Sequence, residues 1–161
     1  MAEETNQKKI CGINVLWLMP PQIALGALII SLGLDYLWPT PEALNFKNPF
    51  LGFLLMGLGF GSVVWTLVLF CKWATTPFPL GKASALVTDG PFRYSRNPIY
   101  LGGVLMLTGC TMVWGSLASL FAPIAFFLAM DLVFIPFEEQ RLQDAFGESY
   151  TAYKNRVRRW L

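Results

Sequence analysis

The chain alternates long apolar blocks with short polar segments, and this pattern predicts a membrane protein. Residues 13–38 and 50–73 are each long enough to cross a hydrocarbon core, which takes about 20 apolar residues. Residues 99–137 are apolar with a break at 114–116, which predicts a tight hairpin of two slightly short spans. Pro20 and Pro21 either kink the first block or mark the start of its helix. The pattern predicts an all-α polytopic membrane protein of about four transmembrane helices, in one domain over residues 1–161.

Two polar segments separate and follow these blocks. The loop 74–97 contains "TTPFPLGK" and is expected to be irregular, with Pro98 in the first turn of the third span. Residues 138–161 are polar, and apolar side chains recur there at helical spacing, so we expect a cytoplasmic amphipathic C-terminal helix. Gly147 is a possible break within it. The residues of the apolar face are Leu142, Phe146, Tyr150, Tyr153 and Val157.

Charge sets the expected orientation of the chain. Eleven of the 12 lysines and arginines lie before the first block, between Lys72 at the end of the second block and residue 97, or after the fourth span, and only Lys47 lies between the first two blocks. The positive-inside rule then places both termini and the loop 74–97 in the cytoplasm. If the source is bacterial, the membrane is expected to be the plasma membrane. The net charge of +2, without a basic arm, argues against a nucleic-acid partner.

The side-chain inventory excludes several kinds of chemistry. There is no histidine, so Ser-His and Cys-His catalysis and histidine-ligated metals are excluded. The three cysteines, Cys11, Cys71 and Cys110, form no CxxC pair, so we expect no metal site. Any chemistry must use other polar side chains or a bound cofactor.

Acidic residues near the end of the fourth span are the first candidates. Asp131 lies in an apolar run seven residues before Glu138, which puts both on one face of a regular helix, and an acid inside a span suggests function. Arg93 or Arg96 is its expected partner. Glu138 and Glu139, taken alone, fit an ordinary interfacial helix as well as a functional site. The stretch "GPFRYSRNPIYLGG", residues 90–103, likewise fits either an interfacial anchor or a shaped loop.

Two motifs together resemble a known family. "GPFRYSRNPIYLG" resembles the RHPxYxG-type motif of the isoprenylcysteine carboxyl methyltransferases and related membrane phospholipid methyltransferases, and "EEQRLQDAFGESYTAYKNRV" resembles their closing signature. The resemblance covers about residues 76–160, the expected cofactor-binding half. It implies a membrane enzyme whose S-adenosylmethionine pocket lies at the cytoplasmic face. The cofactor contacts that it implies are Ser84, Ala85, Leu86, Val87, Phe92, Asn97, Pro98, Ile99, Tyr100 and Glu138.

Two departures bear on the acceptor. Asn97 stands where the carboxyl methyltransferases have histidine, and Phe134 stands where they have an arginine associated with the substrate. We therefore expect a lipid-like or hydrophobic acceptor and leave its reacting group open. Catalytic roles are expected for Arg96, which would pair with a carboxylate or substrate anion, and for Glu139, a base if the acceptor is an amine or hydroxyl.

Two other functions remain open from sequence. A nicotinamide-dependent membrane reductase of the sterol reductase type shares a similar C-terminal architecture, although the adjacent acids favour a cationic cofactor. A non-catalytic membrane scaffold of the same fold is the other possibility. The expected partners are membrane lipids and a lipophilic or lipidated substrate, and the oligomeric state is open.

Overall fold

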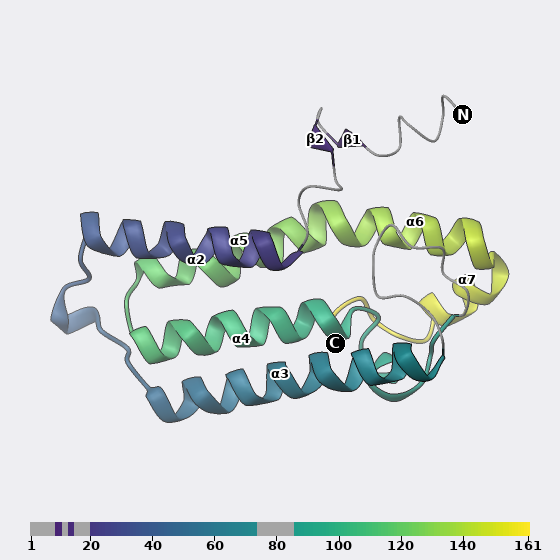
Figure 1. Cartoon of the computed structure of the whole chain (residues 1–161), viewed down its shortest axis with the longest axis horizontal. Coiled ribbons are helices and arrows are strands. Elements are labelled where there is room, and N and C mark those ends of the chain that lie inside the picture. The colour runs from purple at the N-terminus through teal and green to yellow at the C-terminus, as the bar shows by residue number, and fades with distance from the viewer. Residues whose placement is uncertain (1–8, 11–12, 15–19, 74–85) are drawn as a thin grey trace.

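The computed structural model describes residues 9–10, 13–14, 20–73 and 86–161, and its long helices lie side by side (Figure 1). Apart from two paired strands of two residues each, the regular elements in the described part of the chain are helices. The elements are β1 (Lys9–Ile10), β2 (Ile13–Asn14), α2 (Pro20–Leu37), η2 (Glu42–Leu44), α3 (Pro49–Lys72), η3 (Gly90–Arg93), α4 (Pro98–Trp114), η4 (Ala118–Leu120), α5 (Phe121–Ala129), the π-helical η5 (Met130–Phe134), α6 (Ile135–Phe146) and α7 (Glu148–Lys154).

Three helices are long and apolar enough to cross a membrane. They are α2, α3 and the continuous helix Ala118–Phe146, which joins η4, α5, η5 and α6. The third predicted span, α4, is apolar but has only 17 residues, so its crossing stays a prediction. The helix does not stop where the apolar run ends at Phe137 but continues through polar residues up to Phe146.

Prolines and glycines set several helix ends, at the positions that were expected from the sequence. Pro20 begins α2, and Pro98 begins α4, because a proline at the first helical position loses no hydrogen bond. Gly115 ends α4 with a φ of 81°, a left-handed conformation that glycine adopts without strain. Gly147, with a φ of 52°, separates α6 from α7. The predicted breaks at 114–116 and at Gly147 are both confirmed.

Glycines allow α3 and α4 to pack closely in antiparallel orientation. A Cβ built on Gly59 would lie 2.5 Å from the Gly102 carbonyl oxygen, and one on Gly109 would lie 2.6 Å from the Gly52 carbonyl oxygen. The two contacts lie seven residues apart on each helix, so they recur on the same faces. Gly57 and Gly61 face elsewhere, and a Cβ on either would meet nothing within 4 Å. Of the three glycines in 57–61, Gly59 is therefore the one that serves the packing of α3 on α4.

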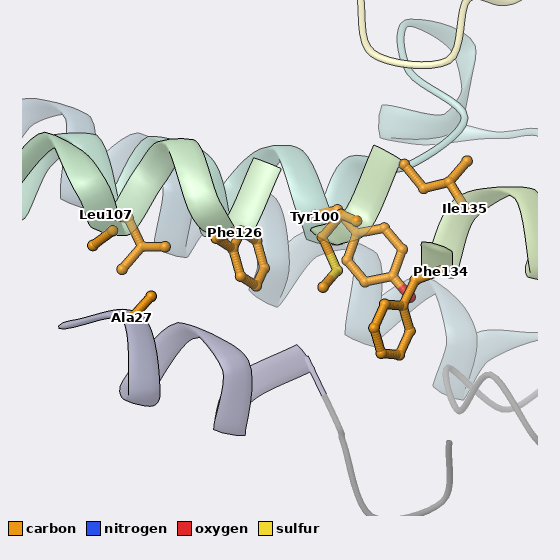
Figure 2. Close-up of a cluster of buried hydrophobic side chains, with 8 residues drawn as sticks. Ala27, Tyr100, Leu107, Phe126, Phe134 and Ile135 are labelled. Carbon is orange, nitrogen blue, oxygen red and sulfur yellow. The ribbon is translucent and has the colours of Figure 1, made fainter. Parts of the chain in front are cut away.

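A second helix pair, α2 with α5, encloses the hydrophobic core (Figures 1 and 2). Its buried members come from α2, α4, α5, η5 and α6. Figure 2 shows Phe134 beside Tyr100, at the point where α4 begins. Phe134 is thus part of the packed core. The buried core residues are Ala27, Tyr100, Leu107, Ala122, Phe126, Met130, Phe134 and Ile135.

The connections divide between the two ends of the helix bundle. At one end, the segments 38–48 and 115–120 contact each other, and the Leu117 amide donates to the Thr40 hydroxyl at 2.8 Å. At the other end lie the described part of the loop before α4, α7 and the tail 155–161 (Figure 1). The two polar motifs therefore meet at one end of the molecule.

Candidate functional site

A charged cluster joins the two motifs at that end. It consists of Arg96 from the loop before α4, Asp131 on η5, Glu139 on α6, Lys154 on α7 and Arg159 in the tail. Glu139 pairs with Arg96 Nη1 at 2.9 Å, with Arg159 Nη2 at 3.0 Å and with Lys154 Nζ at 3.6 Å. The side chains of Arg96 and Glu139 are about nine-tenths buried. Because burial of an unpaired charge is costly, each of the two charges needs its ion-pair partners to be stable there.

Arg159 makes the most extensive contacts in the charged cluster. Its guanidinium donates to both carboxylate oxygens of Glu139, at 3.1 and 3.0 Å, and to Asp131 Oδ1 at 3.2 Å. Its own carbonyl accepts from Asn97 Nδ2 at 3.0 Å and from the Ser95 hydroxyl at 3.3 Å. The hydrogen bond to Glu139 is the main cause that raises the pKa of Arg159, so this side chain stays charged at any ordinary pH.

The expected partner of Asp131 is wrong. Asp131 pairs with Arg159 and accepts from Trp160 Nε1 at 2.9 Å, while Arg96 pairs with Glu139 and Arg93 pairs with Asp89 at 3.1 Å. Asp131 therefore shares its arginine with Glu139 and not with Glu138. The π-helical segment Met130–Phe134, which lies between Asp131 and the two glutamates, is the physical reason.

A second link between the motifs lies beside the charged cluster. The Tyr100 hydroxyl donates to Glu138 Oε1 at 2.5 Å. Tyr100 lies in the first turn of α4, four residues after Arg96, and Glu138 precedes Glu139. Two neighbouring contacts therefore join the start of α4 and the loop before it to α6. Tyr100 and Glu138, both expected cofactor contacts, are therefore in direct contact.

The other predicted contacts divide into three groups. Val87 and Phe92 are buried in a second hydrophobic cluster, with Leu86 packed against it. Asn97, Pro98 and Ile99 form the start of α4, where the Pro98 carbonyl accepts from Ser62 at 3.1 Å. Ser84 and Ala85 lie outside the described residues.

The predicted amphipathic face covers this second hydrophobic cluster. Tyr150 and Tyr153 are buried in it, and the Tyr153 hydroxyl donates to the Phe92 carbonyl at 2.8 Å. Burial raises the pKa of both tyrosines, so both hydroxyls stay protonated at neutral pH. The remaining predicted face residues pack against the cluster and are Leu142, Phe146 and Val157. The face is therefore confirmed, although it is divided between α6, α7 and the tail.

Sequence reasoning missed the tail. Arg159 and Trp160 follow the motif "YKNRV". A helical spacing of apolar residues could not reveal them, because the residues after Lys154 are not helical. Trp160 also stacks on Phe127, with ring centroids 4.7 Å apart. The available clue was Asp131, since an acid in an apolar run demands a cation or a donor.

A shallow apolar groove lies next to the charged cluster. It has a volume of about 480 Å³, and its walls come from α3, the loop before α4, the first turns of α4 and the tail. Gly57, Gly61 and Trp65 supply the α3 wall, and Ser95 lies at the opposite side next to Arg96. Trp65 is 53% exposed, so this wall belongs to the outer surface of α3. The groove connects the outside of an apolar helix with the polar end of the molecule.

Long apolar helices with a buried charged cluster at one end define an integral membrane protein with a polar site at the end of its helix bundle. The chain belongs to the phospholipid methyltransferase family, whose sequence pattern matches residues 48–149. This match covers more than half of the chain, from the start of α3 into α7. Membership implies S-adenosylmethionine-dependent methyl transfer to a lipid-like substrate.

One relative supports a shared sequence core without adding a function. An uncharacterised protein of Haemophilus influenzae is 36% identical over 63 residues, which are 39% of this chain and the whole of that protein. No solved structure matches the chain.

Proposed function

We propose that the protein transfers a methyl group from S-adenosylmethionine to a lipid-like acceptor at the cytoplasmic face of a membrane. The observation that carries this proposal is the pair of contacts that joins the two motifs, Arg96 with Glu139 and Tyr100 with Glu138. Membership in the phospholipid methyltransferase family supports it. We also propose that α4 crosses the membrane as a fourth span, since it packs along α3 through Gly59 and Gly102.

The side chains present fit this cofactor. Within the described residues, the Nε of Arg96 is buried and has no hydrogen-bond partner, which leaves a donor for a carboxylate group. Glu138 supplies a carboxylate that suits ammonium and ribose hydroxyl groups. When bound, S-adenosylmethionine supplies an already activated methyl group, so the protein's tasks are to bind, to orient and to exclude water.

Tyr100 and Glu138 are proposed to hold the cofactor, together with the start of α4 at Asn97. Because Tyr100 already donates to Glu138, one oxygen of that carboxylate is fixed in direction before any ligand binds. A carboxylate held in this way loses little conformational freedom on binding. Leu86, Val87 and Phe92, together with Ser84 and Ala85, are proposed to complete the cofactor wall.

Arg96 and Glu139 keep their proposed catalytic roles, and Glu139 in addition holds Arg96 in place. Both oxygens of Glu139 accept hydrogen bonds from Arg159, and one also contacts Arg96. This arrangement favours Glu139 as the group that holds Arg96 in place. If the acceptor is an amine or a hydroxyl, Glu139 remains our candidate base.

We propose that the hydrocarbon part of the acceptor reaches the site along the apolar groove. Gly61→Leu would fill the groove, whereas Gly33→Leu adds the same side chain to an equally open position on α2. The first variant should raise the KM for a long-chain acceptor by about tenfold and leave cofactor affinity unchanged. A tenfold change corresponds to the loss of about 1.4 kcal/mol of binding free energy between the acceptor chain and the groove. Equal KM values for both variants would contradict this route.

Cofactor binding tests the function directly. Titration calorimetry on the purified protein in lipid nanodiscs should show binding of S-adenosylmethionine, and Glu138→Ala should weaken it by about tenfold or more, as expected for a lost charge-assisted contact. Glu148→Ala, an exposed acid at the start of α7, is the control. Incubation of membranes with methyl-labelled cofactor would then identify the acceptor. Absence of cofactor binding, or preferential binding of NADPH, would overturn the proposal.

A further inference from the structure

The π-helical segment changes which acid shares a face with Asp131. The Ile135 amide donates to the Met130 carbonyl, five residues back, so η5 contains one residue more than an α-helical turn would. Pro136 follows directly, lacks an amide hydrogen and would clash with the Leu132 carbonyl in a regular helix. The wider turn removes that conflict.

This extra residue rotates the acids relative to one another. In a regular helix, Asp131 and Glu139 would point about 80° apart, because each residue turns the chain by about 100°. With one residue absorbed by the π turn, the separation falls to about 20°, while Glu138 turns about 120° away. The contacts agree, because Asp131 and Glu139 share Arg159 and Glu138 binds Tyr100.

Arg159 lies between Asp131 and Glu139, which the π turn brings onto one face of the helix. Its guanidinium bridges Glu139 and Asp131, and its carbonyl is held by Ser95 and Asn97 from the loop before α4. One residue therefore ties together η5, α6 and the loop that carries Arg96. Trp160, which donates to the same oxygen of Asp131, supports this position.

We propose that Arg159 is a positioning residue of the cofactor site, acting through Glu139 on Arg96. This inference rests on the proposed function. Arg159 itself needs no contact with cofactor or acceptor, since Glu139 lies between it and Arg96. Asp131 serves as the second anchor that sets the direction of the guanidinium. The π turn before Pro136 makes this double contact possible.

The test compares Arg159→Gln, Arg159→Lys and the control Arg158→Gln in nanodiscs. Arg158 is adjacent and exposed, and its contact to the Arg96 amide at 3.0 Å is made by its backbone carbonyl, which the Gln variant keeps. Arg159→Gln should raise the dissociation constant for S-adenosylmethionine and lower kcat, on the order of tenfold to a hundredfold together, as misplacement of a site group does. Arg159→Lys should recover part of both, and Arg158→Gln should match the wild type.

Further measurements separate positioning from folding. The Asp131→Asn variant keeps its shape, and combined with Arg159→Gln it should add nothing to the loss seen for Arg159→Gln alone, because the two side chains act as one unit. If Arg159→Gln does not fold, Asp131→Asn alone should still weaken cofactor binding several-fold. The inference is overturned if Arg159→Gln binds cofactor as Arg158→Gln does, if the losses are additive, or if Arg159→Gln lowers Tm while the folded protein binds normally. A wild type that binds no cofactor would instead contradict the proposed function.

Discussion

At the scale of single residues, Glu138 and Glu139 show how neighbours acquire different environments. Glu139 lies among Arg96, Lys154 and Arg159, whereas Glu138 accepts from the Tyr100 hydroxyl. The first is part of an ion-pair network, and the second presents a carboxylate next to the start of α4. Replacement of the two acids should therefore have different effects.

Glu139→Gln should lower the stability of the folded protein by about 3 kcal/mol, because it leaves the buried Arg96 without its counter-charge. Thermal unfolding in nanodiscs measures this change. Glu148→Gln, which alters an exposed acid, should stay within about 0.5 kcal/mol of the wild type. Equal stabilities for the two variants would show that the charged cluster does not hold the fold together.

Tyr153→Phe should change the response to alkaline pH. Burial raises the pKa of the Tyr153 hydroxyl, so its contribution to stability is complete below the ordinary tyrosine pKa of about 10 and is lost as pH rises above it. The variant should be less stable at pH 8 by about 1 kcal/mol, since the Phe92 carbonyl loses its donor. It should also lose less stability than the wild type between pH 10 and pH 11. Parallel unfolding curves across that interval would contradict this assignment.

At the scale of elements, α3 carries two sets of glycines with different tasks. Gly52 and Gly59 let the α4 backbone approach, whereas Gly57 and Gly61 line the groove and contact no neighbour. The same residue type therefore serves helix packing on one face and leaves a hollow on another.

Gly59→Ala should destabilise the protein by about 1–3 kcal/mol, because the added methyl group meets the Gly102 carbonyl. Gly57→Ala should be neutral or stabilising by up to about 1 kcal/mol, since alanine favours the helix and finds open space there. Unfolding by a denaturing detergent, monitored through tryptophan fluorescence, compares the two variants. A larger loss for Gly57→Ala would mean that the helices pack on other faces.

Local signals in the sequence predicted most of the elements, since prolines and glycines act within one turn. Pro98 and Gly115 therefore gave the bounds of α4. The partner of Asp131 was not predictable in the same way. It depends on a π turn that no periodicity rule includes, and on Arg159, 28 residues further along the chain. Of the candidate site, sequence gave the motif residues, while the tail that joins them required the folded chain.

At the scale of the whole molecule, all the polar contacts of the proposed site lie at one end of the helix bundle. The segments 38–48 and 115–120 lie at the other end (Figure 1). The distribution of lysine and arginine predicts an even number of spans, with the loop before α4 and the tail on one side of the membrane. We propose that the end with the site faces the cytoplasm.

Cysteine labelling tests that orientation. Cys71 is exposed near the end of α3, and Lys47→Cys introduces a thiol at the opposite end of the bundle. With Cys11 and Cys110 replaced by serine, a membrane-impermeant maleimide should label Lys47→Cys in intact cells and Cys71 only in inverted vesicles. Labelling of Cys71 in intact cells would place the site on the outer face.

The tail contact also imposes an order on biosynthesis. Arg159 follows α2, α3, α4 and the helix Ala118–Phe146 in the chain, so the ribosome makes it after all of them. Asp131 and Glu139 can therefore gain this shared partner only after 28 and 20 further residues have been made. A chain that stops before Arg159 would keep every long helix and lose the contact that joins Asp131 to Glu139.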